Sequence, residues 1–164
     1  NTYWMKDISL KMKKMGYKLN TKEINEAIKK TVWPGRLEII NYKNKKIILD
    51  GSHNIDGADK LNEFLKTERI KPIVLFGMLN NKKANLFLNK IKKRVSKVLA
   101  IEIPDEKNSF KTKHINEICD FHSIECEQIN NINDALKYFR SNQQKIYLIT
   151  GSLYLIGKIR KKLL

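Results

Sequence analysis

A carboxylate, a glycine, a hydroxyl, an imidazole and an amide follow one another at residues 50–54 of this 164-residue sequence. Asp50, Ser52, His53 and Asn54 could contact a ligand together, because each offers a hydrogen-bonding or titratable group. The same residue types also form ordinary turns, in which Asp50 and Asn54 bond only the local backbone. The segment alone leaves both interpretations open, so the elements that position it must be considered.

The segment lies between a predicted strand and a predicted helix. The run from Lys45 to Leu49 has the length and the isoleucine content of a buried strand. Residues 55–66 place apolar side chains at helical spacing. Asp50 to Asn54 is therefore predicted to be a strand-to-helix turn. In open α/β sheets, ligands bind at such turns, outside the carboxyl ends of the strands.

Two further predicted strands end in glycine beside polar residues. Residues 72–76 run into Gly77 and then reach Lys82–Lys83, where an ammonium group could meet an anion, and residues 145–150 run into Gly151–Ser152. Small residues at three strand ends are typical of a shallow ligand crevice. The sequence carries neither the dinucleotide fingerprint nor the phosphate loop, so a nucleotide-hydrolysing site is not complete in it.

The order of the predicted elements indicates the fold. Residues 37–42 and 45–49 are two strands joined by Lys43–Asn44, which predicts an antiparallel hairpin. From there strands alternate with helices, which favours a parallel sheet covered on both faces. The predicted class is a doubly wound α/β domain, whose mostly parallel sheet has one antiparallel edge strand. The later strands are predicted at 72–76, 97–103, 123–129 and 145–150, and the helices at 55–66, 85–95, 114–121, 133–141 and 153–162.

The beginning of the chain is predicted to belong to something else. Residues 1–15 and a segment capped by Thr21 form two short amphipathic helices, too small to be a domain. Pro34 and Gly35 then break the helical pattern. We therefore expect residues 1–32 to be the tail of an upstream domain with its linker, and residues 33–164 to form one domain.

Arg36 directly follows this boundary. A planar guanidinium beside a glycine suits bidentate contact with a phosphate or a carboxylate. A surface ion pair with the nearby Glu38 explains the residue equally well on local grounds.

Composition narrows the class of protein. The net charge of +16 invites a nucleic-acid function, but the lysines are spread along the chain, so we expect no nucleic-acid partner. No apolar run reaches the roughly 20 residues of a membrane helix, which favours a cytoplasmic protein without a membrane partner. The two cysteines are too few for a disulfide framework or a metal-ligand set.

Four blocks together resemble the C-terminal domain of bacterial dihydrofolate synthase/folylpolyglutamate synthase, a member of the Mur ligase superfamily. They are Trp33–Glu38, Leu49–Asn54, Phe76–Leu79 and Thr150–Gly157. Three positions depart from the family pattern: Ser52 replaces Ala, Ile55 replaces Pro, and Asn81 stands where an acidic residue is common. The last departure puts any metal or amine contact of that loop in doubt.

The resemblance implies an ATP-dependent ligase that adds L-glutamate to dihydropteroate or a folate through an acyl phosphate. It assigns ATP contacts to Arg36 and Asp50, and glutamate contacts to His53 and Ser152, with Arg36 and His53 acting in catalysis. The phosphate loop and Mg²⁺ ligands would lie in an N-terminal ATPase domain of the same chain, and the enzyme would be a monomer. Without that domain this chain should be inactive. A cell-wall ligase of the Mur type is the nearest alternative, and a basic nucleic-acid-binding module is an alternative of another class.

Overall fold

The computed structural model describes residues 10–18, 20, 22–24, 26 and 33–164, and the chain divides into two compact units, Asn1–Trp33 and Pro34–Leu164. In the first unit, residues 10–14, 22–24 and 26 are helical. Gly16, with a φ of +91°, follows the first helical run. The remainder of the two predicted N-terminal helices, including the Thr21 cap, lies outside the described residues.

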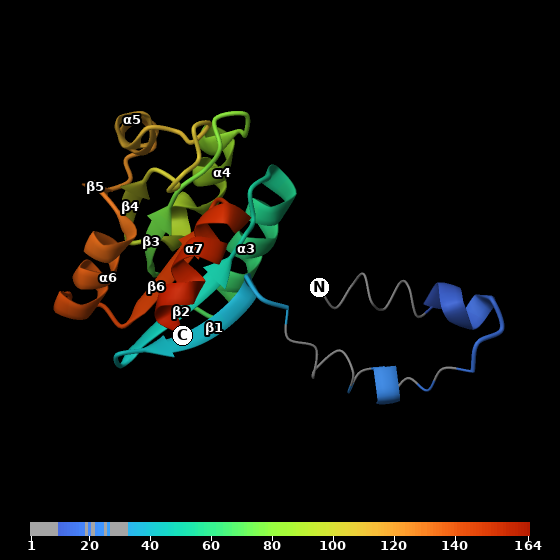
Figure 1. Cartoon of the computed structure of the whole chain (residues 1–164). Coiled ribbons are helices and arrows are strands. Elements are labelled where there is room, and N and C mark those ends of the chain that lie inside the picture. Colours follow the sequence, from blue (N-terminus) through green and yellow to red (C-terminus); the bar gives the residue numbers. More distant parts are fainter. Residues whose placement is uncertain (1–9, 19, 21, 25, 27–32) are drawn as a thin grey trace. The chain divides into compact units, whose positions relative to one another are not determined.

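A six-stranded sheet organises the second unit (Figure 1). β1 is antiparallel to β2, and all the other neighbouring strands are parallel. The predicted doubly wound plan with one antiparallel edge is therefore confirmed. In spatial order the strands are β1 (Arg36–Tyr42), β2 (Lys45–Asp50), β6 (Ile146–Thr150), β3 (Ile73–Phe76), β4 (Lys97–Ile101) and β5 (Cys126–Ile129).

Helices cover both faces of this sheet, as predicted. One apolar core joins the sheet to α3 (Ile55–Thr67), α4 (Ala84–Ile91) and α5 (Thr112–Phe121). A second core joins the opposite face to α6 (Ile132–Ser141) and α7 (Leu153–Leu163). The strands β2, β6, β3 and β4 alternate their side chains between the two cores, which explains why these central strands are almost wholly apolar.

Several element boundaries differ from the predicted ones. The helix predicted at 85–95 ends at Ile91 and continues as the 3₁₀ turn η1 (Lys92–Arg94). The strand predicted at 97–103 ends at Ile101, and the N–H of Ile103 donates to the Ser109 hydroxyl. The strand predicted at 123–129 begins only at Cys126.

The β1–β2 hairpin follows the predicted turn chemistry. Lys43 and Asn44 have φ angles of 47° and 62°, the left-handed conformation that a two-residue hairpin of type I′ requires. Tyr42 and Lys45 face each other across the turn. The hairpin sets a regular register as far as Glu38, opposite Leu49. An irregularity between Arg36 and Glu38, where Leu37 has a φ of 52°, then brings Arg36 opposite Asp50.

Three strand ends meet at the carboxyl edge of the sheet. Thr150 is in register with Asp50 on one side and with Phe76 on the other, so Gly51, Gly77 and Gly151 begin three adjoining turns. The turns are tightly packed, because a Cβ at Gly151 would lie 2.5 Å from the carbonyl oxygen of Gly77. The predicted common edge for the candidate residues is therefore confirmed. In the described part of the chain, no helix has the length and apolarity that crossing a membrane requires.

Candidate functional site

Asp50 holds the backbone at the centre of the carboxyl edge. Asp50 is only 5% exposed. Its two carboxylate oxygens accept hydrogen bonds from the N–H groups of Ser52 at 2.8 Å and Leu37 at 3.2 Å. These bonds tie the end of β2 to the start of β1. Asp50 therefore has the turn-forming role that its residue type suggested. The same bonds position Ser52, next to His53, and Leu37, next to Arg36.

His53 projects from the turn that Asp50 shapes. Its Nδ1 lies 2.9 Å from the carbonyl oxygen of Gly51, which can only accept, so Nδ1 carries a proton. Among the described residues, Nε2 has no hydrogen-bond partner. The half-buried imidazole therefore presents one unused nitrogen.

Arg36 does not pair with Glu38, so that local alternative is wrong. Glu38 accepts instead from Arg160 of α7, with Nε at 3.0 Å from both carboxylate oxygens, and from the N–H of Gly35 at 2.8 Å. These contacts, the Arg160 hydrogen bond first, lower the pKa of Glu38 below its usual value. Within the described residues, Arg36 makes no hydrogen bond or ion pair, so its guanidinium remains available.

Ser152 caps a helix. Its hydroxyl accepts from the N–H of Tyr154 at 3.1 Å, and the residue is 3% exposed. Serine commonly caps helix N-termini in this way, and the helix capped here is α7. Ser152 nevertheless lines the hollow described next, because the cap lies where the turn after β6 meets the surface.

Two adjoining hollows share His53, Asn81 and Lys82. The larger, of about 380 Å³, extends over the N-termini of α3 and α4. The smaller, of about 240 Å³, extends over the turn that begins α7. The remaining lining residues are Asn54, Ile55, Asp56 and Lys83 in the first, and Leu79, Gly151, Ser152, Leu153 and Tyr154 in the second.

The larger hollow favours anions. Lys82 and Lys83 supply two ammonium groups and Asp56 the only carboxylate of its lining. Two helix N-termini also open beside it, and Lys83, at the N-cap of α4, makes no side-chain cap bond. The sequence predicted a possible anion contact for the two lysines. Leu79 and Tyr154 stood only within the blocks of resemblance, with no site role, because residue spacing gives no signal of their place in the smaller hollow.

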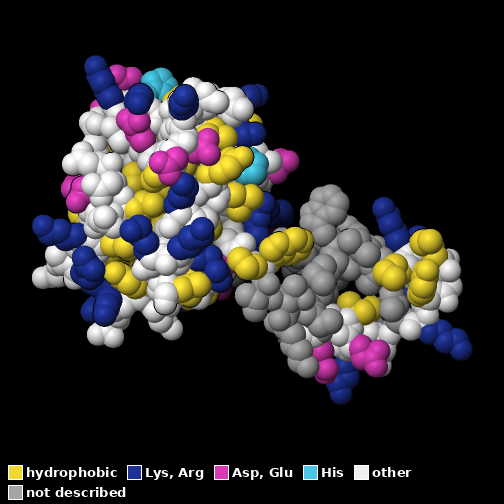
Figure 2. All heavy atoms as spheres, viewed as in Figure 1, with side chains coloured by type: hydrophobic (Ala, Val, Ile, Leu, Met, Phe, Trp, Pro, Cys, Tyr) yellow, Lys and Arg dark blue, Asp and Glu magenta, His cyan; other side chains and the backbone are white. Residues whose placement is uncertain are grey.

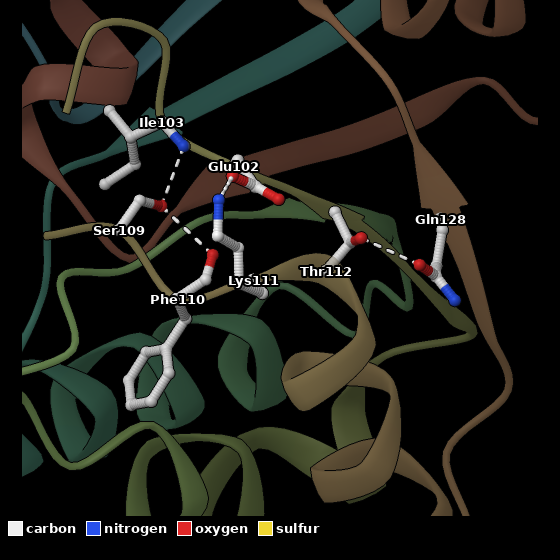
Figure 3. Close-up of polar contacts among 7 residues, drawn as sticks. All are labelled: Glu102, Ile103, Ser109, Phe110, Lys111, Thr112 and Gln128. Carbon is white, nitrogen blue, oxygen red and sulfur yellow. Dashed lines mark hydrogen bonds and ion pairs between the residues drawn. The ribbon is translucent and has the colours of Figure 1, made fainter. Parts of the chain in front are cut away.

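A second loop braces the one that carries Asn81 and Lys82. Ser109 forms a β-bridge with Leu79, and the N–H of Asn80 donates to the Asn108 carbonyl at 2.7 Å. Figure 3 shows how this second loop is held: the Ser109 hydroxyl accepts from the N–H of Ile103 and donates to the Phe110 carbonyl. The hollow is thus built on a fixed loop.

The ends of this bracing loop are also joined. Lys111, just before α5, pairs with Glu102, just after β4, at 2.7 Å (Figure 3). Thr112 donates to the Gln128 side chain of β5 at 2.7 Å. Both contacts are exposed to solvent, where such contacts add little to stability. Their main effect is to fix the local geometry of the loop.

A metal site does not fit the described residues. In residues 33–164 and the described N-terminal segments, no group of three or more His, Cys, Asp or Glu side chains gathers where it could hold an ion. Asn81 stands in the loop where the resemblance had led us to look for an acidic residue. We therefore derive no step that passes through a metal held by this chain.

The architecture defines a class: a doubly wound α/β domain with an open hollow, lined by two lysines and one carboxylate, at the carboxyl edge of its sheet, where such domains bind ligands. The chain belongs to the family of dihydrofolate synthetase C-terminal domains, whose family model matches residues 36–162. The resemblance seen in the four sequence blocks is thereby confirmed.

The chain matches part of several longer proteins. It is 31% identical over 157 residues to dihydrofolate synthase/folylpolyglutamate synthase of Bacillus subtilis, covering 88% of this chain and 34% of that protein. The crystal structure of folylpolyglutamate synthase from Thermotoga maritima matches with a TM-score of 0.74 and 27% identity, over 93% of this chain and 35% of that one. Folylpolyglutamate synthase of Mycobacterium tuberculosis, solved with ADP and AMPPCP, matches in fold with a TM-score of 0.74 and 20% identity, over 91% and 36%. The chain thus spans about a third of the length of these relatives.

Proposed function

We propose that this chain is the glutamate-side domain of a cytoplasmic, monomeric ATP-dependent ligase that adds L-glutamate to dihydropteroate or a folate. The observation that carries the proposal is the cationic crevice around His53 and Lys82 in a domain of the matched family. The family match and the named relatives favour this reaction over cell-wall amino-acid ligation and over a nucleic-acid-binding module.

The proposed chemistry is activation of a carboxylate followed by attack of an amine. The carboxylate of dihydropteroate or of a folate attacks the γ-phosphorus of ATP, which forms an acyl phosphate and releases ADP. The glutamate amine then attacks that carbonyl carbon, and phosphate leaves. Positioned cations and reactants held in register are the main sources of acceleration in such reactions.

Arg36 and Asp50 would serve the nucleotide side. The guanidinium of Arg36 is without a partner in the described part of the chain, so its planar fork is free to meet phosphate oxygens. Asp50 would act through the backbone, because both of its oxygens are engaged by N–H groups. It fixes Leu37, the residue that follows Arg36, and so orients the strand from which Arg36 projects.

His53 and the hollows would serve the glutamate side. The two carboxylates of glutamate suit Lys82, Lys83 and the helix N-termini. The free Nε2 of His53 could accept a proton or hydrogen bond from the incoming amine. Ser152 would contribute by capping α7 at the rim. Mg²⁺ ligands, the phosphate loop and the folate site would belong to the N-terminal domain of the longer protein.

The test is ligation of labelled L-glutamate by the full-length protein, with Arg36→Lys and His53→Ala as variants. Arg36→Lys keeps the charge but loses the fork, so kcat should fall by about 10²-fold, roughly 2.7 kcal/mol. His53→Ala should raise the KM for glutamate more than the KM for ATP.

Arg94→Lys is the matched control, because Arg94 precedes β4 and lies at the opposite edge of the sheet. It should leave kcat and both KM values unchanged. Near-normal kinetics in Arg36→Lys and His53→Ala, with only the melting temperature altered, would refute the assigned roles.

A further inference from the structure

The opposite, amino edge of the sheet carries a second concentration of positive charge. A hollow of about 620 Å³ is lined there by the β1–β2 hairpin and by the start of β6. β2 and β6 run in parallel from this hollow toward Asp50 and Thr150, so it lies a full strand length away from the candidate ligase crevice. Its lining residues are Asn41, Lys43, Asn44, Lys45, Lys46, Lys145 and Ile146.

The charges of this hollow are not balanced. Its lining contains four lysines and no acidic residue. Some of the other described lysines and arginines face a carboxylate, as in the pairs Lys90–Asp59, Lys97–Glu127 and Arg160–Glu38. None of the four lysines forms an ion pair with a described residue. Figure 2 shows Lys and Arg side chains along the lower left of the domain, where Figure 1 places the hairpin tip and α6.

Lys45 is the most informative of the four. The residue is only 8% exposed, although lysine is rarely buried without an anionic partner. Its ammonium donates to the carbonyl oxygens of Asn142 at 2.5 Å and Gln144 at 2.9 Å, both uncharged. Both carbonyls lie at or just after the C-terminus of α6, whose dipole favours a cation, and among the described residues no third acceptor contacts the ammonium.

The backbone holds further cations next to this buried charge. The N–H of Lys46 donates to the carbonyl oxygen of Lys145 at 2.8 Å, so the backbones of these two lysines meet where β2 and β6 begin. An anion in the hollow would meet lysine side chains together with the amides of Asn41 and Asn44.

We propose that this hollow is a binding site for a small anion with two or more phosphate-type charges, separate from the ligase crevice. Four ammonium groups and two side-chain amides offer donors for several phosphate oxygens, and charge-assisted bonds of this kind are the strong ones. The site is open, which suits a solvated small molecule. No exposed aromatic side chain lines it, so no base-stacking surface for single-stranded nucleic acid is present.

Inorganic pyrophosphate is the probe, and the 164-residue chain is the protein. Titration followed by backbone amide chemical shifts should show a saturable site with shifts centred on residues 43–46 and 144–146, distinct from any shifts at residues 81–83. Lys145→Gln and Lys46→Gln should each weaken binding by about tenfold, the typical effect of one lost charge-assisted hydrogen bond. Both side chains reach solvent, so both variants should fold.

Lys90→Gln is the matched control. It removes the same charge from a lysine already paired with Asp59, and pyrophosphate binding should not change. His53→Ala should also leave it unchanged, because His53 belongs to the other edge.

Three outcomes would overturn the proposal: no saturable shifts at the hairpin, equal weakening by Lys90→Gln, or shifts confined to residues 53 and 81–83. Binding of a twelve-nucleotide single strand at the hairpin without binding of pyrophosphate would likewise overturn it in favour of a nucleic-acid surface.

Discussion

Asp50 holds two backbone N–H groups of the carboxyl edge with one side chain. Asp50→Ala would leave the N–H groups of Leu37 and Ser52 without their acceptor in a buried place, which costs about 1–3 kcal/mol. We expect the melting temperature of the chain to fall by roughly 5 °C. In the full-length enzyme the KM for ATP should rise more than the KM for glutamate, because the strand bearing Arg36 loses its anchor. An unchanged melting temperature would contradict this account of the turn.

The ion pair of Glu38 and Arg160 should make stability depend on pH. The folded state lowers the pKa of Glu38 from the ordinary value of 4.5, chiefly through the Arg160 hydrogen bond. The pair therefore stabilises the fold above about pH 4.5, and this contribution is lost as the pH falls toward the lowered folded value.

The measurement is the melting temperature of the wild type and of Glu38→Gln between pH 7 and pH 3. The gap between the two curves should be a few degrees near neutral pH and should shrink below about pH 4.5. A gap that stays constant over this range would contradict the role given to the pair.

Individual residues were predicted best where the chain order alone decides their position. Asp50, His53 and Ser152 follow strands, so a parallel sheet necessarily brings them to one edge. The Arg36–Glu38 pair, an alternative that local spacing left open, does not form, because Arg160 lies 122 residues away in the chain and approaches Glu38 only through packing of α7. The burial of Lys45 likewise depends on carbonyl groups nearly 100 residues distant.

At the scale of elements, two glycines near α7 should respond oppositely to the same substitution. Gly151 has a φ of +103°, and a Cβ there would lie 2.5 Å from the Gly77 carbonyl oxygen. Gly157 lies inside α7, and nothing comes within 4 Å of a Cβ at that position. Gly157→Ala should therefore stabilise the domain by about 0.5–1 kcal/mol, since alanine favours helix.

Gly151→Ala should destabilise it by at least about 1–3 kcal/mol, through backbone strain and displacement of the β3 turn. Chemical denaturation of the two variants would measure both changes. A loss of stability in Gly157→Ala, or none in Gly151→Ala, would show that the turn packing has been misjudged.

Element types were predictable from the sequence, whereas several ends were not. Apolar runs and helical periodicity indicated every strand and helix of the second unit. The end of β4 was misplaced because Ile103 is as apolar as a strand residue, yet its N–H bonds the Ser109 hydroxyl instead of a neighbouring strand. A side chain that captures one backbone group leaves no trace in a hydrophobic pattern.

At the scale of the whole molecule, the purified 164-residue chain should show no ATP hydrolysis and no glutamate ligation. The described residues lack a metal cluster, and the sequence lacks a phosphate loop, so half of the proposed active site is missing. The assay is phosphate release and label incorporation, with the full-length protein as the positive control. Robust turnover by the chain, free of contaminating enzyme, would refute the two-domain proposal.

The position of β6 has a consequence for how the protein is made. This strand is the last one synthesised, yet it pairs with β2 on one side and β3 on the other. Until residue 150 has left the ribosome, the hairpin and the β3–β4–β5 half have no strand to join them. During this time the nascent chain therefore exposes two sheet edges, and exposed sheet edges are prone to aggregation. A stop codon between β5 and β6 should leave two unjoined half-sheets, which the cell would degrade.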